Sequence, residues 1–341
     1  MRLEKAPSLA YRKAKALRER DRMTDQPDTA APFIRPDMQG FLAMMAQANG
    51  PKLADMTLEE ARASYVALHG IADRPARELA VIRDCTCPGP GGDIALRLYD
   101  ARAHREGPTP VITFYHGGGF VIGDLATHHA LCSEIAALID LPLVAVDYRR
   151  APEAPFPAAI EDCEAATRWI AGSPVELGYE TSGLVTIGDS AGGNATVVIG
   201  QLLAARPAAV PVVLQVPLFP LIADAIGSAS MAAFAEGFLL TGETMAFFDA
   251  AYAADRSDPR GFPILGDHSS APPTVLVTAS LDPIRDSGRA YAKALADAGR
   301  DFVFLEMKGV THSFTNLRAA VPSTQADLER IIAAMRLMLG A

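Results

Sequence analysis

The sequence predicts an α/β fold: a mostly parallel, eight-stranded sheet with helices on both faces and a helical cap. Three observations predict it. Eight short apolar runs lie between residues 79 and 306, and several are continuous, as in strands buried on both faces. From residue 111 onward these runs alternate with helical stretches, which indicates βαβ units. One interval, between residues 216 and 274, is too long for a simple crossover and predicts an insertion.

The composition is that of a globular protein, because half of the 341 residues are hydrophobic and 21% are charged. The formal net charge is −9, yet residues 1–22 carry eight basic and three acidic side chains. The acidic remainder argues against nucleic acid as a partner. We interpret residues 1–24 as a basic leader, helical or frayed in solvent. No apolar stretch is long enough to span a membrane, and we expect a cytoplasmic protein.

The four cysteines, Cys85, Cys87, Cys132 and Cys163, do not form a complete metal site. Cys85 and Cys87 share one face of an expected strand, but no pair of ligands elsewhere completes a zinc site. We therefore expect reduced, structural cysteines, no metal and no cofactor.

Residues 25–75 are predicted to form an N-terminal helical cap. An apolar helical run covers residues 41–48 and ends at Asn49-Gly50-Pro51. Thr57 begins a second helix as its N-cap, Glu60 stands at the capping-box position, and Gly70 closes the helix.

Residues 76–341 are predicted to form the main domain. No helix separates the first two apolar runs, so we expect these strands to be antiparallel at one edge of the sheet. The expected strands are residues 79–81, 94–99, 111–115, 143–146, 184–187, 210–216, 274–278 and 302–306.

The helices of this domain are expected between the later strands, at residues 131–139, 158–169, 195–205, 288–298 and 326–339. The insertion covers about residues 220–258. Its segment 228–255 has a helical pattern rich in Phe, Met and Ala. We expect it to lie over the C-terminal ends of the strands and to contribute to the cap.

A candidate nucleophile lies in the segment Gly188-Asp189-Ser190-Ala191-Gly192-Gly193, between an expected strand and an expected helix. Small residues on both sides permit a sharp, strained turn that exposes the Ser190 hydroxyl. The N-terminus of the following helix favours developing negative charge beside it. By itself the pattern is also compatible with an ordinary glycine-rich turn.

A second glycine-rich segment, His116-Gly117-Gly118-Gly119-Phe120, follows the expected strand 111–115. Three glycines leave backbone N–H groups open to close approach by a ligand. Such a loop, together with the N–H of Ala191, is suited to hold an oxyanion. His116 precedes the serine in the chain, and we interpret it as support for the loop.

A serine nucleophile needs a base and an orienting carboxylate. Among seven histidines, His312 is favoured because it follows the expected strand 302–306, at the end of the sheet where sites form. Asp282 ends another strand and is favoured over Asp286, four residues later. The other histidines are expected to be solvated or structural: His69, His104, His116, His128, His129 and His268.

Taken together, these motifs resemble the hormone-sensitive-lipase-like, or family IV, bacterial esterases of the α/β-hydrolase fold. The matching segments are HGGGF at 116–120, DYRRAPE at 147–153, GDSAGG at 188–193, DPIRD at 282–286 and HSF at 312–314. The segment IRPDMQGFL at 34–42 resembles the GDSAG subgroup, and the resemblance covers about residues 25–340. Arg150 departs from the family pattern, which usually has leucine there.

The resemblance implies a carboxylesterase that acts on short-chain acyl esters without a cofactor. It implies Ser190 as nucleophile, His312 as base and Asp282 as its partner, and a cap that shapes the acyl pocket. It also implies that the oxyanion-hole donors are Gly118, Gly119 and Ala191. The residues that support these motifs are His116, Gly117, Asp189 and Asp286.

Specificity is expected to depend on the cap. The candidate pocket-lining residues are Phe33, Phe41, Met44, Met45, Phe219, Phe234 and Phe238, and each is equally compatible with ordinary packing. An amidase, a lactonase or a deacetylase with the same triad remains an alternative, as does a small-molecule receptor on this scaffold. The partner is expected to be a small ester, with a homodimer through the late edge strand as a further expectation.

Overall fold

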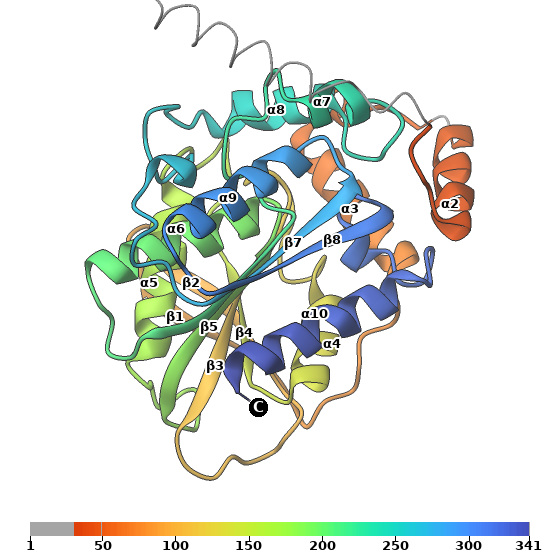
Figure 1. The fold of residues 1–341 in the computed structure, drawn as a ribbon. Helices are drawn as coiled ribbons and strands as arrows, with labels where there is room; N and C mark the ends of the chain where they lie inside the picture. Colours follow the sequence, from red (N-terminus) through yellow and green to blue (C-terminus); the bar gives the residue numbers. More distant parts are fainter. Residues whose placement is uncertain (1–30, 49, 341) are drawn as a thin grey trace, which may run out of the picture. The chain divides into compact units, whose positions relative to one another are not determined.

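A computed structural model describes residues 31–48 and 50–340 of the chain (Figure 1). The chain divides into two compact units, Met1–Phe33 and Ile34–Ala341, and every helix and strand given below belongs to the second. The expected basic leader, residues 1–24, lies outside the described residues.

The second unit is built on one eight-stranded sheet, in the order β1-β2-β4-β3-β5-β6-β7-β8. β2 pairs antiparallel with β1 and with β4, whereas the other neighbours are parallel. The expectation of a mostly parallel sheet with an antiparallel edge is confirmed. The strands are β1 (Val81–Gly89), β2 (Gly92–Asp100), β3 (Thr109–Tyr115), β4 (Leu143–Asp147), β5 (Thr181–Asp189), β6 (Val212–Leu218), β7 (Thr274–Leu281) and β8 (Phe302–Thr311).

β1 is longer than its apolar run suggested. Only its first residues have an apolar pattern, and the strand continues through Arg83 and Asp84 to Gly89. As an edge strand it exposes most of its side chains, and Asp84 accepts two hydrogen bonds from Arg97 of β2. Cross-strand charge pairs of this kind replace the hydrophobic pattern that identifies a buried strand.

Helices cover both faces of the sheet (Figure 1). α4 (His129–Ile139) and α10 (Thr324–Leu339) pack on one face, where the larger hydrophobic cluster is buried. α5 (Ala158–Ala171), α6 (Ala191–Ala205) and α9 (Arg285–Asp297) pack on the other. Three short 3₁₀ turns complete this framework: η1 (Leu53–Asp55), η2 (Pro263–Leu265) and η3 (Phe314–Asn316).

Two helices precede the sheet: α2 (Pro36–Gln47) and α3 (Leu58–Ala72). The expected capping box is present, because Thr57 Oγ1 accepts from Glu60 N at 3.3 Å and Glu60 accepts from Thr57 N at 2.8 Å. The expected end at Gly70 is wrong: α3 continues to Ala72, with Asp73 as its C-cap. Tertiary contacts of its last turn outweigh the weak helix propensity of one glycine.

The insertion forms two short helices rather than one, α7 (Ala229–Phe234) and α8 (Gly242–Tyr252). Gly237 and Leu239 between them have positive φ values of 80° and 74°, which no helix accommodates. α7 and α8 lie above the sheet in Figure 1, beyond the ends of the strands. Within residues 31–48 and 50–340, no helix has both the length and the apolar character needed to cross a membrane.

Candidate active site

Ser190 stands between β5 and α6, at the N-cap of the helix, with φ 55° and ψ −113°. A Cβ atom added at Gly192 would lie 1.8 Å from the Tyr115 carbonyl oxygen, and one added at Gly188 would lie 2.4 Å from that of Gly192. Glycine is therefore required on both sides of the serine by contact with backbone atoms. This strained turn directs Ser190 to the wall of a cavity at the C-terminal ends of the strands.

His312 and Asp282 follow β8 and β7, and the fold brings them together. His312 Nδ1 lies 2.7 Å from Asp282 Oδ2, and both side chains are buried. Asp282 also accepts from the backbone N–H of Ile284 at 2.8 Å, which sets the orientation of the carboxylate. Because Nδ1 of His312 contacts Asp282, Nε2 of His312 is the nitrogen available to a nucleophile.

Asp286, the weaker candidate for this role, lies elsewhere. Its carboxylate accepts from the backbone N–H of Ser230 at 2.7 Å and pairs with Arg285. Asp286 therefore anchors α7 onto the start of α9. Of the two aspartates, only Asp282 contacts His312 in the described part of the chain.

Ser190 and His312 line the same cavity. Among the described residues, the Ser190 hydroxyl has no hydrogen-bond partner. In enzymes without substrate the contact between nucleophile and base is often long and shortens on binding. The arrangement thus has His312 oriented by Asp282 and the half-buried Ser190 at the same wall.

The glycine-rich loop after β3 contributes Gly118 and Gly119 to this wall. Their φ values are 114° and 61°, a region that glycine adopts without steric cost. A Cβ on Gly118 would lie 2.2 Å from the Ile122 carbonyl oxygen, and one on Gly119 would lie 2.2 Å from the ring of Phe248. Ala191 adds an N–H at the first position of α6, where no intrahelical acceptor exists.

Asp189 joins the serine turn to the glycine loop. Its Oδ1 accepts from Gly117 N at 2.8 Å and lies 3.1 Å from His128 Nε2. Burial raises the pKa of Asp189, but the interaction with His128, which includes a hydrogen bond, outweighs burial and holds the pKa below its ordinary value. One ionised carboxylate therefore holds both backbone segments that border Ser190.

His116 lies behind the glycine loop. Its Nδ1 contacts the Gly117 carbonyl at 2.8 Å, and its ring stacks on Tyr148 with centroids 4.1 Å apart. Burial, together with the nearby His128, lowers the pKa of His116 to about 3, so the ring is neutral at physiological pH. In the described chain, no group of three or more His, Cys, Asp or Glu side chains could hold a metal ion.

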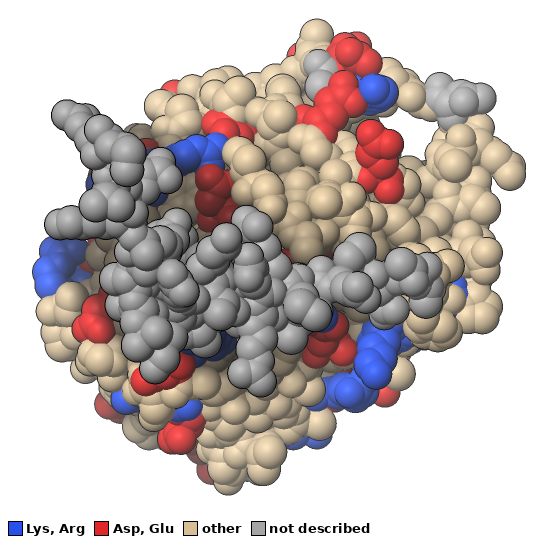
Figure 2. All heavy atoms as spheres, turned by 45° about the horizontal axis from the view of Figure 1, so that its top comes forward, with Lys and Arg blue, Asp and Glu red and all other residues tan. Residues whose placement is uncertain are grey.

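The cavity has a volume of about 790 Å³, and most of its lining is apolar. Charged pairs lie at its border: Lys52 with Glu243 at 2.8 Å, and Arg256 with Asp224 and Asp249 at 2.6 and 2.7 Å. Figure 2, which turns the α7–α8 side toward the viewer, shows acidic and basic side chains scattered among uncharged ones.

Of the seven residues expected to line the pocket, six belong to the second compact unit, and of these six the structure places only Met45 at the cavity. Phe41 is buried in the core, and Met44 points outward with 54% exposure. Phe33, which belongs to the first compact unit, is 65% exposed. Helix phase explains the difference between Met44 and Met45, because adjacent residues of α2 face directions about 100° apart.

The other three expected pocket residues support neighbouring groups instead. Phe219 packs edge-on against His312, with ring centroids 4.9 Å apart. Phe234 and Phe238 pack against each other at 5.2 Å, and Arg285 lies over the Phe234 ring. These rings pack against His312 and within the α7 region rather than forming the cavity wall.

Sequence reasoning missed the side chains of α3 and α8 that do line the cavity. α3 contributes Tyr65, Leu68 and His69, and α8 contributes Met245 and Phe248. The three residues of α3 are spaced i, i+3 and i+4, which places them on one helix face. That spacing was visible in the sequence, but the face that turns toward the cavity depends on how the helix docks.

Comparison with known proteins agrees with this geometry. Residues 112–316 match the model of a family described as alpha/beta hydrolase fold. The chain belongs to this family, and within it to the hormone-sensitive-lipase-like esterases that its motifs resemble.

Two curated relatives illustrate the similarity. The carboxylic ester hydrolase LipN of Mycobacterium tuberculosis is 39% identical over 264 residues, 75% of this chain and 70% of that protein. The ethyl acetate hydrolase of Pseudomonas putida is 32% identical over 316 residues, 89% of this chain and 98% of that protein. A solved structure of the hyperthermophilic esterase from Pyrobaculum calidifontis matches with a TM-score of 0.82 and 32% identity, covering 91% of this chain and 100% of that one.

Proposed function

We propose that this enzyme hydrolyses short-chain carboxylic esters with Ser190 as nucleophile, His312 as general base and acid, and Asp282 as the group that orients His312. The observation that carries the proposal is the 2.7 Å contact between Asp282 and His312 on the cavity wall that also bears the strained Ser190. The carboxylate fixes the tautomer and stabilises the imidazolium that forms during the reaction.

The reaction has two half-reactions. His312 removes the Ser190 proton as the oxygen attacks the ester carbonyl, and the resulting tetrahedral species loses its alcohol, which takes the proton from His312. Water then attacks the acyl-serine, giving its proton to His312, and the acid leaves as Ser190 is protonated again.

The backbone N–H groups of Gly118, Gly119 and Ala191 are the proposed donors to the oxyanion. Support comes from the open conformation of the loop and from the position of Ala191 at the start of α6. One such donor contributes roughly 3 kcal/mol to transition-state stabilisation. His116, Gly117 and Asp189 act as support for this loop.

The cap is proposed to consist of residues 25–75 together with the insertion at 220–258. Support comes from α3 and α8, which both contribute side chains to the cavity wall beside Ser190. The short-chain preference follows the family resemblance, and one relative is named for ethyl acetate, a two-carbon acyl ester.

The proposal is tested with p-nitrophenyl esters from acetate to laurate, assayed on the wild-type protein and on Ser190→Ala in parallel. The expected result is activity that peaks at short acyl chains and is absent in the variant. Matched amides and lactones in the same assay separate an esterase from an amidase or a lactonase. A folded protein inactive on every ester would contradict the proposal.

A cytoplasmic location and a homodimer are further proposals. The cysteines are free in the described chain, as in proteins of a reducing compartment. β8 is the last strand of the sheet and exposes Phe304 at its edge, which suits pairing with a second copy. Cell fractionation tests the location, and light scattering tests the dimer.

A further inference from the structure

One buried histidine on the cavity wall has no part in the proposed mechanism. His69 lies in the last turn of α3, is only 5% exposed, and lines the cavity together with Tyr65 and Leu68. The Tyr65 and His69 rings lie 4.2 Å apart, which adds a phenol to the same wall. The surrounding lining is largely apolar, so His69 is a distinct polar position within it.

The protonation of His69 follows from its neighbours. Its Nδ1 lies 2.8 Å from the backbone carbonyl oxygen of Thr127, which can only accept, so Nδ1 carries the hydrogen. Burial, with a contribution from His128, lowers the pKa of His69 to about 4. The ring is therefore neutral at physiological pH, and Nε2 carries a lone pair and no hydrogen.

Nε2 has no hydrogen-bond partner among the described residues, although the ring is buried and lines the cavity. Nε2 itself is open to the cavity rather than sealed from it, so a ligand that donates to it forms a hydrogen bond that no protein group supplies. A carboxylate, an ether or a ketone cannot donate. A hydroxyl or an N–H group can.

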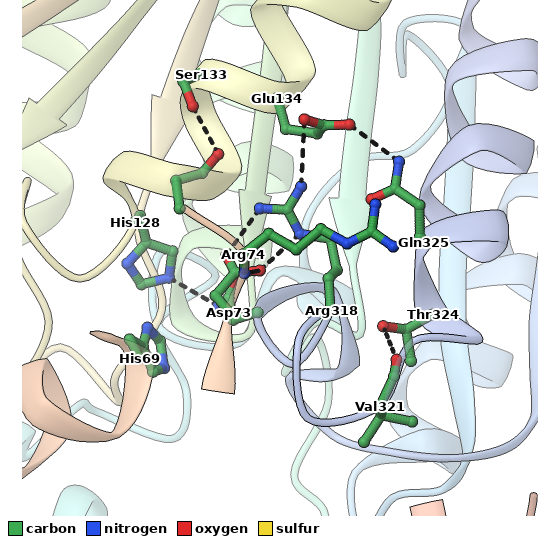
Figure 3. A network of polar contacts seen from close by, with 12 residues as sticks. His69, Asp73, Arg74, His128, Ser133, Glu134, Arg318, Val321, Thr324 and Gln325 are labelled. Atoms are coloured by element: carbon green, nitrogen blue, oxygen red, sulfur yellow. Dashed lines mark hydrogen bonds and ion pairs between the residues drawn. The ribbon is translucent and has the colours of Figure 1, made fainter. Parts of the chain in front are cut away.

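His69 is held rigidly in this orientation. Four residues along the chain, Asp73 accepts two hydrogen bonds from the buried Arg318, at 2.7 and 2.9 Å, and Figure 3 shows the two residues together with Glu134 and Gln325. Ala319 and Ala320 also donate backbone N–H groups to Ala72 O. The end of α3 is thus anchored beside the Thr127 bond, so binding a donor requires little reorganisation.

We propose that His69 Nε2 forms a substrate subsite that accepts a hydrogen bond from a hydroxyl or N–H group of the ester, and that hydroxylated esters are preferred over plain ones. The inference rests on the proposed ester hydrolysis and adds the substrate class. The donor can be carried by the acyl or by the alcohol part, and the two arms of the experiment distinguish these sources.

The acyl arm compares methyl hexanoate with its 3-, 5- and 6-hydroxy derivatives and with the matching methoxy compounds. The alcohol arm compares hexyl acetate with 6-hydroxyhexyl and 6-methoxyhexyl acetate. The expected result is a kcat/KM about tenfold higher for at least one hydroxylated ester than for its plain and methoxy counterparts, the size of one hydrogen bond to a neutral acceptor.

The variant His69→Asn isolates the acceptor, because the asparagine amide N–H can still donate to Thr127 O but places no atom at the Nε2 position. In this variant the ratio of kcat/KM for the hydroxylated ester to that for the plain ester should fall to about one. Hydrolysis of the plain ester reports whether the pocket is intact. His268→Asn is the matched control: its ring contacts Ile264 O at 3.2 Å, away from the cavity, and the preference should persist.

A wild-type protein that hydrolyses these esters but prefers no hydroxylated one in either arm overturns the inference, as does a preference that His69→Asn leaves unchanged. Calorimetric binding of the same uncleaved esters to Ser190→Ala decides the question without turnover. Tighter binding of a hydroxylated ester, lost in Ser190→Ala/His69→Asn, supports the subsite even if the wild type hydrolyses none of these esters. Equal binding of plain and hydroxylated esters rejects it.

Discussion

At the scale of single residues, several side chains of the site are held in place by backbone atoms. Asp282 is oriented by the N–H of Ile284, and His69 by the carbonyl of Thr127. Asp189 is held by the N–H of Gly117 on the opposite loop. Backbone partners do not change rotamer, so such contacts fix the functional side chains at little entropic cost.

Asp282→Asn should lower kcat by roughly a thousandfold or more, because the amide favours the wrong histidine tautomer and no longer stabilises the imidazolium. KM should change little, since Asp282 does not line the cavity. Steady-state kinetics on a short p-nitrophenyl ester measures both. Asp286→Asn is the control: it weakens the attachment of α7 to α9 and should cost far less, so equal losses in the two variants would contradict the assignment.

At the scale of elements, contact between α8 and the glycine loop links the cap to the proposed oxyanion hole. The Phe248 ring occupies the space where a side chain on Gly119 would lie. An element of the insertion therefore touches the loop that is expected to stabilise the transition state. We therefore expect acyl specificity and catalytic rate to be coupled through this contact.

Gly119→Ala should reduce kcat/KM about a hundredfold, because the new methyl group meets Phe248 and alanine resists a φ of 61°. Phe248→Ala removes the steric part of that conflict. The double variant should therefore recover part of the loss, which a double-mutant cycle of kcat/KM values measures. If the effects of the two substitutions on kcat/KM are strictly additive, the Phe248 ring has no steric contact with the loop.

At the scale of the whole molecule, buried neutral histidines make stability depend on pH. The pKa of His69 is lowered to about 4 and that of His116 to about 3, whereas an unfolded histidine titrates near 6.5. Below pH ~6.5 the unfolded chain binds protons that the folded chain does not. The free energy of unfolding therefore falls as pH falls from ~6.5 toward 4.

His116→Gln should reduce the slope of the unfolding free energy against pH between pH ~6 and 4.5. The reduction should be up to about 1.4 kcal/mol per pH unit, which corresponds to the loss of one titrating proton. Urea unfolding at a series of pH values measures the effect as the change in slope rather than as absolute stability. Exposed His104 offers a control, since His104→Gln should leave the slope unchanged. Identical slopes for all three proteins would mean that His116 is protonated in the folded state.

The proposed homodimer is also a property of the whole molecule. β8 leaves one edge of the sheet unpaired in the described structure, and Phe304 is 37% exposed there. Light scattering should give a dimer mass for the wild type and a monomer mass for Phe304→Lys, because a charge on the edge opposes strand pairing. A monomeric wild type at working concentration rejects the proposal.

The sequence by itself determined the fold class, the order of the strands along the chain and the strand ends that carry Ser190, Asp282 and His312. These follow from local patterns: buried strands are continuous apolar runs, and glycines mark turns that a Cβ atom would block. Local patterns failed at the charged edge strand β1 and at Gly70, where pairing and packing outweigh propensity.

Only the tertiary structure decided which side chains face the cavity. The sequence favoured large apolar residues such as Phe41, Phe219 and Phe234, which instead pack in the core, against His312 and within the α7 region. Tyr65, His69 and Phe248 line the cavity because α3 and α8 dock with particular faces inward. A helix turns about 100° per residue, so its rotation on docking, which depends on contacts distant in sequence, determines the pocket.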